Sequence, residues 1–389
     1  MNRQESIAIL AKYGISLTEK QWDENSQQKV VVGMSGGVDS SVTALLVKLY
    51  GFETVGIFMK NWEEIDANGV CSAELDYEDV VSVCSKLDIP YYNVNFSEEY
   101  KNNVFDTFVS EYKKGYTPNP DILCNREIKF KVFYQNAKEL GADFLATGHY
   151  CQNINNHLVK AVDQNKDQTY FLYTISQDIL GDVLFPLGQL KKPLVREMAK
   201  DFNLVTHDKK DSTGICFIGE RNFKQFLSQY IASLKGEFRE LESGKVLGQH
   251  DGMCFYTIGQ RKGMGIGGPG GPWFVAQKDL DNNIVYVVEG EDHPALYYDY
   301  LLASEESWIN DKPELPLRCS AKIRYRQQDQ ACLVEQTEQG LKVSFEKPQR
   351  AIGIRQSIVF YQDDICLGGA IIQNSGPHYY EQGKKLTNT

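Results

Sequence analysis

The sequence predicts an α/β fold: a doubly wound parallel-sheet domain, followed by a small helical domain and a C-terminal antiparallel β-barrel. Three observations indicate this order. Apolar runs of strand length alternate with helical periodicity over residues 29–175, helical patterns dominate residues 176–241, and short runs separated by Gly, Asn, Asp and Pro fill residues 242–377. Strands that alternate with helices are typical of a parallel sheet covered on both faces, whereas closely spaced short strands are typical of a barrel.

The first domain follows an N-terminal extension, residues 1–28, in which only 6–13 has an amphipathic pattern. The predicted strands of this domain are 30–32, 54–59, 91–96 and 144–147. The predicted helices are 41–50, 73–87, 98–114 and 126–140. Gly51 and Gly141 end the first and the last of these helices, because glycine accepts the left-handed backbone that closes a helix.

The central and C-terminal domains have weaker patterns. The central domain has predicted helices at 195–202 and 222–234. The predicted barrel strands are 274–277, 284–288, 317–325, 331–335, 342–345 and 357–361, and residues 378–389 form a tail. The glycine-rich run 263–271 leads into a strand, so no helix dipole is available there and we interpret it as a loop of the barrel.

Length and charge limit the class of protein. The 389 residues exceed one ordinary hydrophobic core, and no run of about 18 apolar residues suggests a membrane span. The N-terminus lacks a signal-peptide pattern, so we expect a cytoplasmic protein with no membrane partner. The net charge of −11 argues against a surface that is basic throughout, but basic clusters at 126–131, 191–196 and 318–326 leave room for a local nucleic-acid face.

The nine cysteines are an odd number and include no CxxC pair, which argues against a disulfide framework or a structural zinc site. In a reducing compartment a cysteine is more often a small buried hydrophobe than a reagent. A catalytic assignment must therefore rest on the residues around each cysteine.

The most specific motif lies between the first predicted strand and its helix. Its residues are Gly33, Met34, Ser35, Gly36, Gly37, Val38, Asp39, Ser40 and Ser41. Glycines let backbone N–H groups approach a phosphate, and the helix N-terminus adds its positive dipole. The spacing matches neither a Walker A loop nor a dinucleotide fingerprint. The motif therefore predicts an anion site of another type.

Two cysteines have unusual neighbours. Pro118 and Pro120 indicate that residues 115–125 are not helical, so that Asp121 and Cys124 lie at the start of a helix near Arg126. A thiol at a helix N-terminus beside basic residues has a lowered pKa. Cys216 lies between Gly214 and Gly219, after Lys209 and Lys210. From the residues alone, each cysteine is open to two interpretations, a reactive thiol or a buried one.

At this point a resemblance covers nearly the whole chain, from residue 29 to about 376. The loop resembles the SGGxDS motif of the ATP-pyrophosphatase superfamily, and the segments around Cys124 and Cys216 resemble the two cysteine motifs of tRNA-specific 2-thiouridylases. The other segments similar to that family are 60–62, 146–150, 166–168 and 256–263.

The resemblance implies a reaction in two stages. ATP adenylates the 2-carbonyl oxygen of the wobble uridine of a tRNA of the Lys, Glu or Gln type, and pyrophosphate leaves. A persulfide on Cys216, loaded by a cysteine desulfurase or a sulfur-relay protein, then delivers sulfur to the activated carbon. Cys124 attacks the persulfide, which liberates sulfide or leaves a Cys124–Cys216 disulfide. Asp121 is the implied acid or base near the uridine.

The resemblance also implies binding residues. The loop from Gly33 to Ser40 grips the pyrophosphate, Asp39 holds Mg²⁺, and Met59 and Gly148 contact the adenosine. The implied tRNA contacts are Asn119, Pro120, Asp121, His149, Lys166, Asp167, Gln168, Arg324, Tyr325 and Gln356. The chain departs from the family at Ile354-Arg355-Gln356, where Pro-Gly-Gln is usual, so the backbone around Gln356 is expected to differ.

Two other classes of function fit parts of the pattern. An ATP-pyrophosphatase with a different acceptor, such as an amide synthetase or another tRNA thiolase, would use the same loop, but an amide synthetase has no use for both thiols. An RNA-binding protein with a vestigial nucleotide fold would bind tRNA without consuming ATP.

Overall fold

The computed structural model describes residues 1–62, 72–211, 223–231 and 234–386. By internal contacts the chain divides into two compact units. The first comprises Met1–Val104, Asp121–Glu220 and Asp364–Cys366, and the second comprises Phe105–Pro120, Arg221–Asp363 and Leu367–Thr389. Within the described ranges, no helix combines the length and the apolar character needed to cross a membrane.

The first unit is built on a five-stranded parallel sheet in the order β3-β2-β1-β4-β7. Its strands are β1 (Lys29–Met34), β2 (Glu53–Lys60), β3 (Tyr91–Asn95), β4 (Phe144–Ala146) and β7 (Val183–Leu184). Val32 of β1 pairs with Gly56 on one side and with Ala146 on the other. The strand order changes direction between β1 and β4, and ligands of open α/β sheets bind at such a switch point, at the carboxyl ends of the strands.

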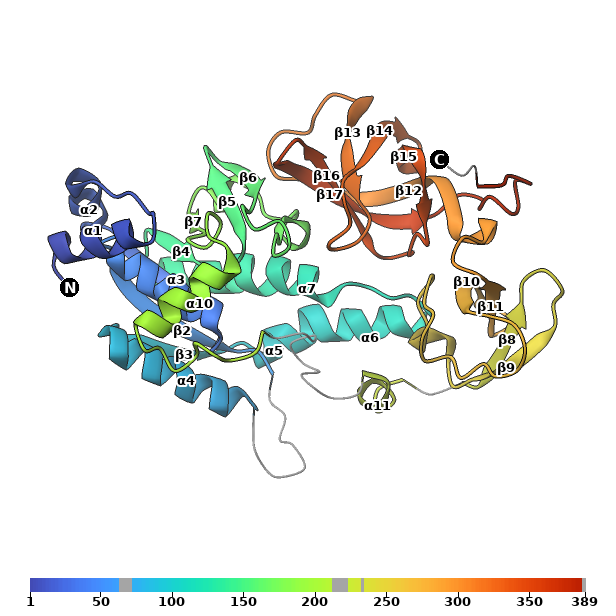
Figure 1. Cartoon of the computed structure of the whole chain (residues 1–389), viewed down its shortest axis with the longest axis horizontal. Helices are drawn as coiled ribbons and strands as arrows, with labels where there is room; N and C mark the ends of the chain where they lie inside the picture. Colours follow the sequence, from blue (N-terminus) through green and yellow to red (C-terminus); the bar gives the residue numbers. More distant parts are fainter. Residues whose placement is uncertain (63–71, 212–222, 232–233, 387–389) are drawn as a thin grey trace. The chain divides into compact units, whose positions relative to one another are not determined.

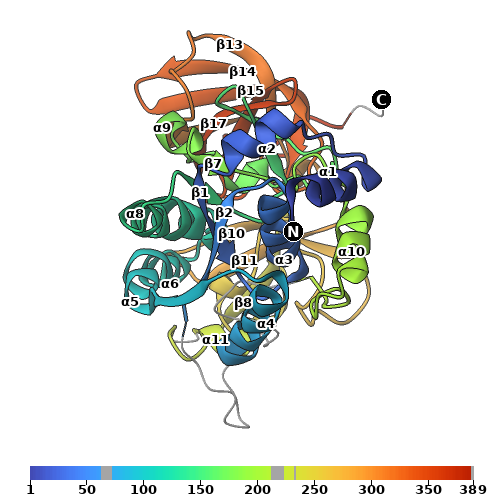
Figure 2. The same cartoon turned by 90° about the vertical axis from the view of Figure 1, so that its left-hand side faces the viewer.

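The first unit also contains helices, which precede, separate and follow the strands of this sheet along the chain (Figure 1). They are α1 (Arg3–Lys12), α2 (Glu19–Asn25), α3 (Val38–Leu49), α4 (Ser72–Leu87), α5 (Ser97–Tyr100), η2 (Cys124–Phe133), α8 (Tyr134–Glu139), η3 (Thr169–Phe171), α9 (Gln177–Leu180) and α10 (Lys192–Asp201). Figure 2 shows α3 and α10 close together, and the two helices are in contact. Val42 and Leu45 of α3 share one core with Val195 and Met198 of α10, so apolar burial fixes the start of both helices near the sheet.

The N-terminal extension is part of the first unit. Asn2 with Glu5 and Thr18 with Gln21 form capping boxes, which satisfy the free N–H groups at the starts of α1 and α2. Leu10 of α1 is fully buried in the core. The sequence predicts only an amphipathic segment at 6–13, whereas the structure has two capped helices in this extension.

A hairpin of β5 (Cys151–Ile154) and β6 (His157–Lys160) follows β4. Ile365 and Cys366 pair with Val159 and Leu158 of this hairpin, which explains why Asp364–Cys366 group with the first unit. The segment between the hairpin and α10 thus includes the edge strand β7 as well as α9, within a range that was predicted to be mostly helical.

The second unit begins with a segment that contains α6 (Asp106–Lys113) and continues with α11 (Phe223–Leu227) and a four-stranded sheet. The sheet order is β10-β11-β8-β9, with β8 (Gly236–Glu240), β9 (Val246–His250), β10 (Trp273–Asp279) and β11 (Ile284–Glu289). β8 and β11 are parallel. The prediction that 274–277 and 284–288 belong to the barrel was wrong, because these residues lie in β10 and β11 of this four-stranded sheet. Its strand β8 was not predicted, because Phe238 is the one fully buried side chain in β8 and the residues show no strand pattern.

The C-terminal barrel has six antiparallel strands and is closed by pairing of β12 with β17. The strands are β12 (Tyr297–Trp308), β13 (Leu317–Lys322), β14 (Gln330–Thr337), β15 (Gly340–Arg350), β16 (Ser357–Gln362) and β17 (Ile365–Asn374). The predicted fold class, a parallel-sheet domain, a middle region and a β-barrel, is confirmed. Several predicted elements differ in length: for example, β13 ends at Lys322, α11 ends at Leu227, and β15 is longer than the predicted 342–345. The predicted domain bounds stay predictions.

Candidate nucleotide and cysteine site

The loop after β1 has the geometry of an anion site. Gly36 has φ +71°, and a Cβ atom there would lie 2.5 Å from the backbone oxygen of Asp76, so only glycine fits. Gly37 is the N-cap of α3 and no side chain caps the helix, so the first N–H groups of α3 have no side-chain acceptor there. The hydroxyl of Ser40 accepts from the backbone N–H of Ser35 at 3.1 Å, which holds the loop in shape.

Asp39, in the first turn of α3, has two partners in the first unit. Nζ of Lys192 lies 2.7 Å and 2.8 Å from its two carboxylate oxygens. The hydroxyl of Tyr150 donates to Oδ1 at 2.8 Å. Burial, together with the nearby carboxylate, raises the pKa of Tyr150, so its hydroxyl remains a donor. The carboxylate is thus oriented from two sides.

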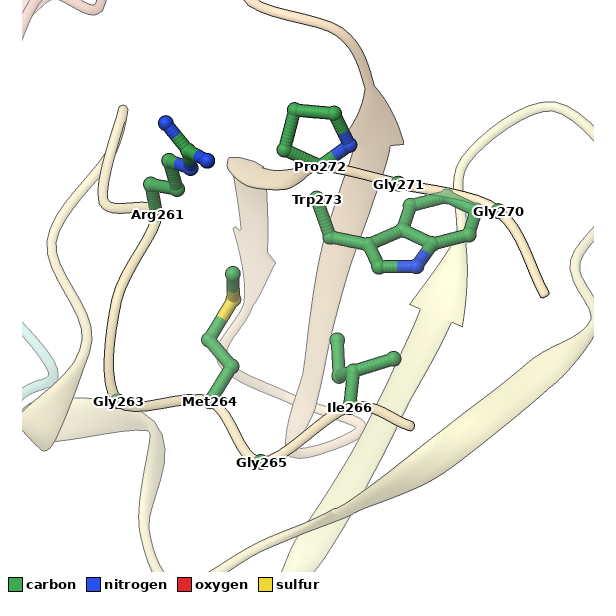
Figure 3. A pocket seen from close by; sticks show the side chains of 9 residues that line it. All are labelled: Arg261, Gly263, Met264, Gly265, Ile266, Gly270, Gly271, Pro272 and Trp273. Atoms are coloured by element: carbon green, nitrogen blue, oxygen red, sulfur yellow. The ribbon is translucent and has the colours of Figure 1, made fainter. Parts of the chain in front are cut away.

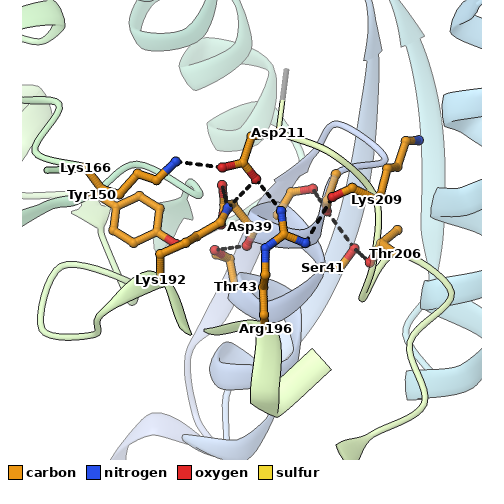
Figure 4. A network of polar contacts seen from close by, with 12 residues as sticks. Asp39, Ser41, Thr43, Tyr150, Lys166, Lys192, Arg196, Thr206, Lys209 and Asp211 are labelled. Atoms are coloured by element: carbon orange, nitrogen blue, oxygen red, sulfur yellow. Dashed lines mark hydrogen bonds and ion pairs between the residues drawn. The ribbon is translucent and has the colours of Figure 1, made fainter. Parts of the chain in front are cut away.

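Lys192 also links Asp39 to Asp211 (Figure 4). The carboxylate of Asp211 lies 2.9 Å from Nζ of Lys192, 2.6 Å from Nζ of Lys166 and 2.7 Å from a guanidinium nitrogen of Arg196. Burial alone would raise the pKa of Asp211, but the hydrogen bonds from Lys166 and Lys192 lower it to about 2. We call these five charged side chains the Asp211 network.

The predicted adenosine contacts lie on the same sheet. Met59 is in β2, next to β1, and is half-buried. Gly148 follows β4, and a Cβ atom there would lie 3.1 Å from the backbone of Asp39 and of Ser40. Gly148 therefore packs against the first turn of α3, beside the loop, and a larger residue would push that turn away.

The helix that carries Cys124 begins earlier than predicted. Pro120 starts α7 (Pro120–Leu123), which runs directly into η2 (Cys124–Phe133), so residues 120–125 are helical. The prediction that residues 115–125 are not helical was therefore wrong for 120–125, because proline is tolerated in the first turn of a helix. Asp121 lies in the first turn, and Cys124 follows one turn later and is buried.

Asp121 and His149 share a basic neighbour, Lys129. Burial raises the pKa of Asp121, although Lys129 acts in the opposite direction. Nζ of Lys129 lies 3.3 Å from Nε2 of His149, and Oγ1 of Thr147 lies 2.8 Å from its Nδ1. Burial and Lys129 both lower the pKa of His149, which keeps the imidazole neutral.

The predicted tRNA residues of the first unit have internal partners. Lys166 binds Asp211, as described above. Asp167 is buried and accepts from the N–H of Ala161 and the hydroxyl of Thr169. The side-chain oxygen of Gln168 accepts from the N–H of Tyr150 at 3.0 Å. These contacts fix the positions of Asp167 and Gln168 relative to Ala161 and to the backbone of Tyr150.

The remaining predicted tRNA residues lie in the second unit. Asn119 and Pro120 end its first segment. Arg324 is exposed and donates to the backbone oxygens of Arg350 and Ala351. Arg326 lies over the ring of Tyr325, beyond the end of β13. Gln356 donates through Nε2 to the backbone oxygen of Thr117.

Cys216 lies outside the described residues, as does the expected Cys124–Cys216 pairing. The described cysteines have no disulfide, and these are Cys84, Cys124, Cys151, Cys254, Cys319, Cys332 and Cys366. Asp211 is the last described residue before residues 212–222, which include Cys216. The Asp211 network therefore holds the chain at the residue that precedes this range.

Lys192, Tyr150 and Asp211 are members of one site that was not predicted from the sequence. Lys192 stood in a basic cluster and Tyr150 in a family motif, but nothing in the linear pattern joined them to Asp39. Among the described residues no group of three or more metal-binding side chains is present. Asp39 still suits Mg²⁺, since that ion binds ATP proteins through one or two carboxylates and takes its other oxygens from phosphate and water.

A separate hollow of about 400 Å³ lies in the second unit (Figure 3). It is formed by the glycine-rich loop and the start of β10, and its lining residues include Arg261, Met264, Ile266 and Trp273. The loop leads into β10, as expected, and not into a helix.

A parallel sheet with a glycine-serine loop at its switch point is followed along the chain by a four-stranded sheet and a β-barrel. This order defines an α/β nucleotide-binding protein with attached β-domains. Family models match it in that order: a tRNA methyl transferase HUP domain over residues 28–220, a tRNA methyl transferase PRC-barrel domain over 224–289, and an aminomethyltransferase beta-barrel domain over 298–372.

Curated relatives narrow the class. The chain is 59% identical over 367 residues to tRNA-specific 2-thiouridylase MnmA of Protochlamydia amoebophila, with 93% of this chain and 97% of the relative covered. It is 55% identical to the protein of the same name from Francisella tularensis subsp. holarctica, with 89% and 99% covered, and 54% identical to that of Staphylococcus epidermidis, with 90% and 96% covered. The chain belongs to the family of tRNA-specific 2-thiouridylases, and the predicted resemblance and the predicted enzyme class are confirmed.

Proposed function

We propose that this chain thiolates the wobble uridine of tRNA at its 2-position, with consumption of ATP. The observation that carries the proposal is the 59% identity to a 2-thiouridylase over 93% of the chain. The geometry of the loop supports it, because an uncapped helix N-terminus and closely approaching glycines suit the phosphates of ATP.

In the first stage, the 2-carbonyl oxygen of the uridine attacks the α-phosphorus of ATP. The bond from that phosphorus to the bridging oxygen breaks, and pyrophosphate leaves from the loop between Gly33 and Ser40. The positive end of α3 stabilises the negative charge that develops on the leaving group. Mg²⁺ held by Asp39 would supply further charge neutralisation at the phosphates.

Asp121 is the proposed acid or base at the uridine. Burial raises the pKa of Asp121, which favours the protonated carboxyl more than in water and suits a group that exchanges a proton with the uridine. The neutral His149 and the nearby Lys129 would complete the polar surroundings of the base. Because His149 is buried, its contact with tRNA would be with a nucleotide that enters the site.

In the second stage, the terminal sulfur of a Cys216 persulfide attacks C2. The C2–O bond then breaks, and AMP leaves with that oxygen. The thiolate of Cys124 then attacks the sulfur of Cys216, so that the S–S bond breaks, 2-thiouridine leaves and a Cys124–Cys216 disulfide remains. In the alternative order Cys124 first liberates sulfide, which attacks C2. A thiol reductant supplies two electrons to restore both cysteines in either case.

The reaction implies partners. A cysteine desulfurase or a sulfur-relay protein would load Cys216, and a tRNA of the Lys, Glu or Gln type would be the acceptor. The cytoplasm, where thiols stay reduced, is the expected location.

Methyl transfer is the second candidate, because the matching family models are described as tRNA methyl transferase domains. Both candidates are tested by incubating the purified chain with unmodified tRNA, ATP, cysteine, a cysteine desulfurase and S-adenosylmethionine as a methyl donor, followed by nucleoside mass spectrometry. We expect sulfur in place of oxygen on the wobble uridine, only when ATP is present. An added methyl group, or unchanged uridine with a loaded persulfide, would refute the proposal.

A further inference from the structure

Lys192 is a buried lysine in direct contact with the phosphate loop. Its side chain is only 10% exposed, and its ammonium lies between the carboxylates of Asp39 and Asp211 and near the ring of Tyr150. Lysine is almost never fully buried without partners, because its charge loses hydration. The position therefore needs an explanation beyond its place at the start of α10.

Holding α10 against α3 is one explanation, but other contacts already do this. Val195, Met198 and Ala199 of α10 are fully buried in the core shared with α3. The hydroxyl of Thr206, beyond α10, donates to Ser41 of α3 at 2.9 Å. A buried ion pair adds little stability compared with apolar packing of similar volume. A purely structural role therefore does not account for the charge.

The surroundings of Lys192 point to an anion. Its partner Asp39 lies in the first turn of α3, where the uncapped N–H groups attract negative charge. Within the Asp211 network three cations contact two carboxylates, which leaves one positive charge in excess among these five side chains. The nearby Asp163 accepts from the backbone N–H of Lys192 and not from its ammonium.

We propose that Lys192 is a further ATP-binding residue, whose ammonium binds the phosphate chain and is held ready by Asp39 and Asp211 when no nucleotide is bound. This inference rests on the proposed ATP-dependent function. On binding, phosphate oxygens replace carboxylate oxygens as partners of Lys192. Asp211 keeps Lys166 and Arg196 as partners, so the network tolerates the exchange.

The test compares affinity for ATP with affinity for adenosine, which lacks phosphates. Lys192→Met removes the charge, and Lys191→Ala removes an exposed lysine one position earlier as the matched control. We expect Lys192→Met to weaken ATP binding by about ten- to a hundredfold, as for the loss of a charge-assisted hydrogen bond, with adenosine binding unchanged. Lys191→Ala should bind both like the wild type.

Lys192→Gln is the second variant, since it keeps a donor for Asp39 if the methionine variant fails to fold. An unchanged ratio of ATP to adenosine affinity in a folded Lys192 variant would overturn the assignment. Pyrophosphate release in the presence of tRNA is measured in parallel on the wild type. If the wild type binds ATP but releases no pyrophosphate, the proposed function fails, while the two affinities still decide the role of Lys192.

Discussion

Nε of Arg355 lies 2.7 Å from Oε2 of Glu111, so a residue beside the last barrel strands is joined to α6 within the second unit. A second nitrogen of Arg355 lies 2.9 Å from Glu305. Arg355 has φ +67°, a left-handed conformation that glycine adopts freely and other residues adopt at a cost of about 1–2 kcal/mol. The ion pairs of Arg355 therefore offset a backbone cost that glycine would avoid.

This relationship predicts different effects for two substitutions at one position. Arg355→Ala loses the ion pairs and keeps the backbone cost, whereas Arg355→Gly loses the ion pairs and removes that cost. We expect Arg355→Ala to lower the free energy of unfolding by about 1–3 kcal/mol, and Arg355→Gly by about 1 kcal/mol less. Denaturant unfolding measures both. Equal destabilisation by the two variants would contradict the backbone explanation.

The buried His149 predicts a pH dependence of stability. Its pKa is lowered in the folded chain by burial and by Lys129, so the unfolded chain binds more protons at mildly acidic pH. Its contribution is complete above the unfolded pKa of about 6.5 and is lost as pH falls toward the folded pKa, with a slope of up to about 1.4 kcal/mol per pH unit. Unfolding should be measured between pH 7.5 and 5.5. His149→Gln should show a flatter slope than the wild type, and parallel slopes would exclude this cause.

The proposed role of Asp39 predicts that its loss affects the reaction of ATP but not the binding of tRNA. Asp39→Ala removes the proposed Mg²⁺ ligand and one carboxylate partner of Lys192. We expect pyrophosphate release to be abolished and tRNA affinity to stay nearly unchanged. A pyrophosphate assay and a filter-binding assay with the same preparation measure the two effects. Normal pyrophosphate release by this variant would remove Asp39 from the site.

Arg324 predicts salt-dependent tRNA binding despite the net charge of −11. If a local basic face binds phosphates, tRNA affinity should fall steeply as salt rises, and Arg324→Ala should weaken binding and reduce the salt slope by about one. Lys347→Ala, which removes an exposed charge from β15, is the control and should bind like the wild type. Equal losses from both variants would indicate a general charge effect, and salt-independent binding would argue against the face altogether.

The cysteines predict separable steps. If Cys216 carries the transferable sulfur, Cys216→Ser should show no protein persulfide after incubation with a cysteine desulfurase and cysteine, yet should still adenylate tRNA. Cys124→Ser should still accept sulfur on Cys216 but stall before 2-thiouridine is released, because no thiolate resolves the S–S bond. Neither variant should form 2-thiouridine.

Peptide mass spectrometry of each variant, together with nucleoside analysis, locates the sulfur. Cys319→Ser, a substitution in the barrel strand β13, is the control and should load and transfer sulfur normally. Sulfur on Cys124 of the wild type, with normal thiolation by Cys216→Ser, would reverse the two roles.

The sequence by itself determined the fold class and the family, because both depend on local patterns. The apolar run Val30–Val32 and the glycines at 33, 36 and 37 predict a buried strand and a phosphate loop from residues that are neighbours in the chain. The same patterns failed where the deciding contact is distant. Pro120 predicts a helix break on its own, but it starts α7 because the first turn of a helix needs no donor from it. Phe238 alone could not reveal that β8 pairs with β11.

Only the tertiary structure decided which charges meet. Asp39 and Lys192 are 153 residues apart in sequence, and they come together because α3 and α10 bury their apolar faces in one core. The same packing brings Tyr150 to Asp39. Apolar burial is non-directional and can be recognised from a one-dimensional pattern, whereas an ion pair depends on the position of two side chains to within an ångström or so, which only the assembled core provides.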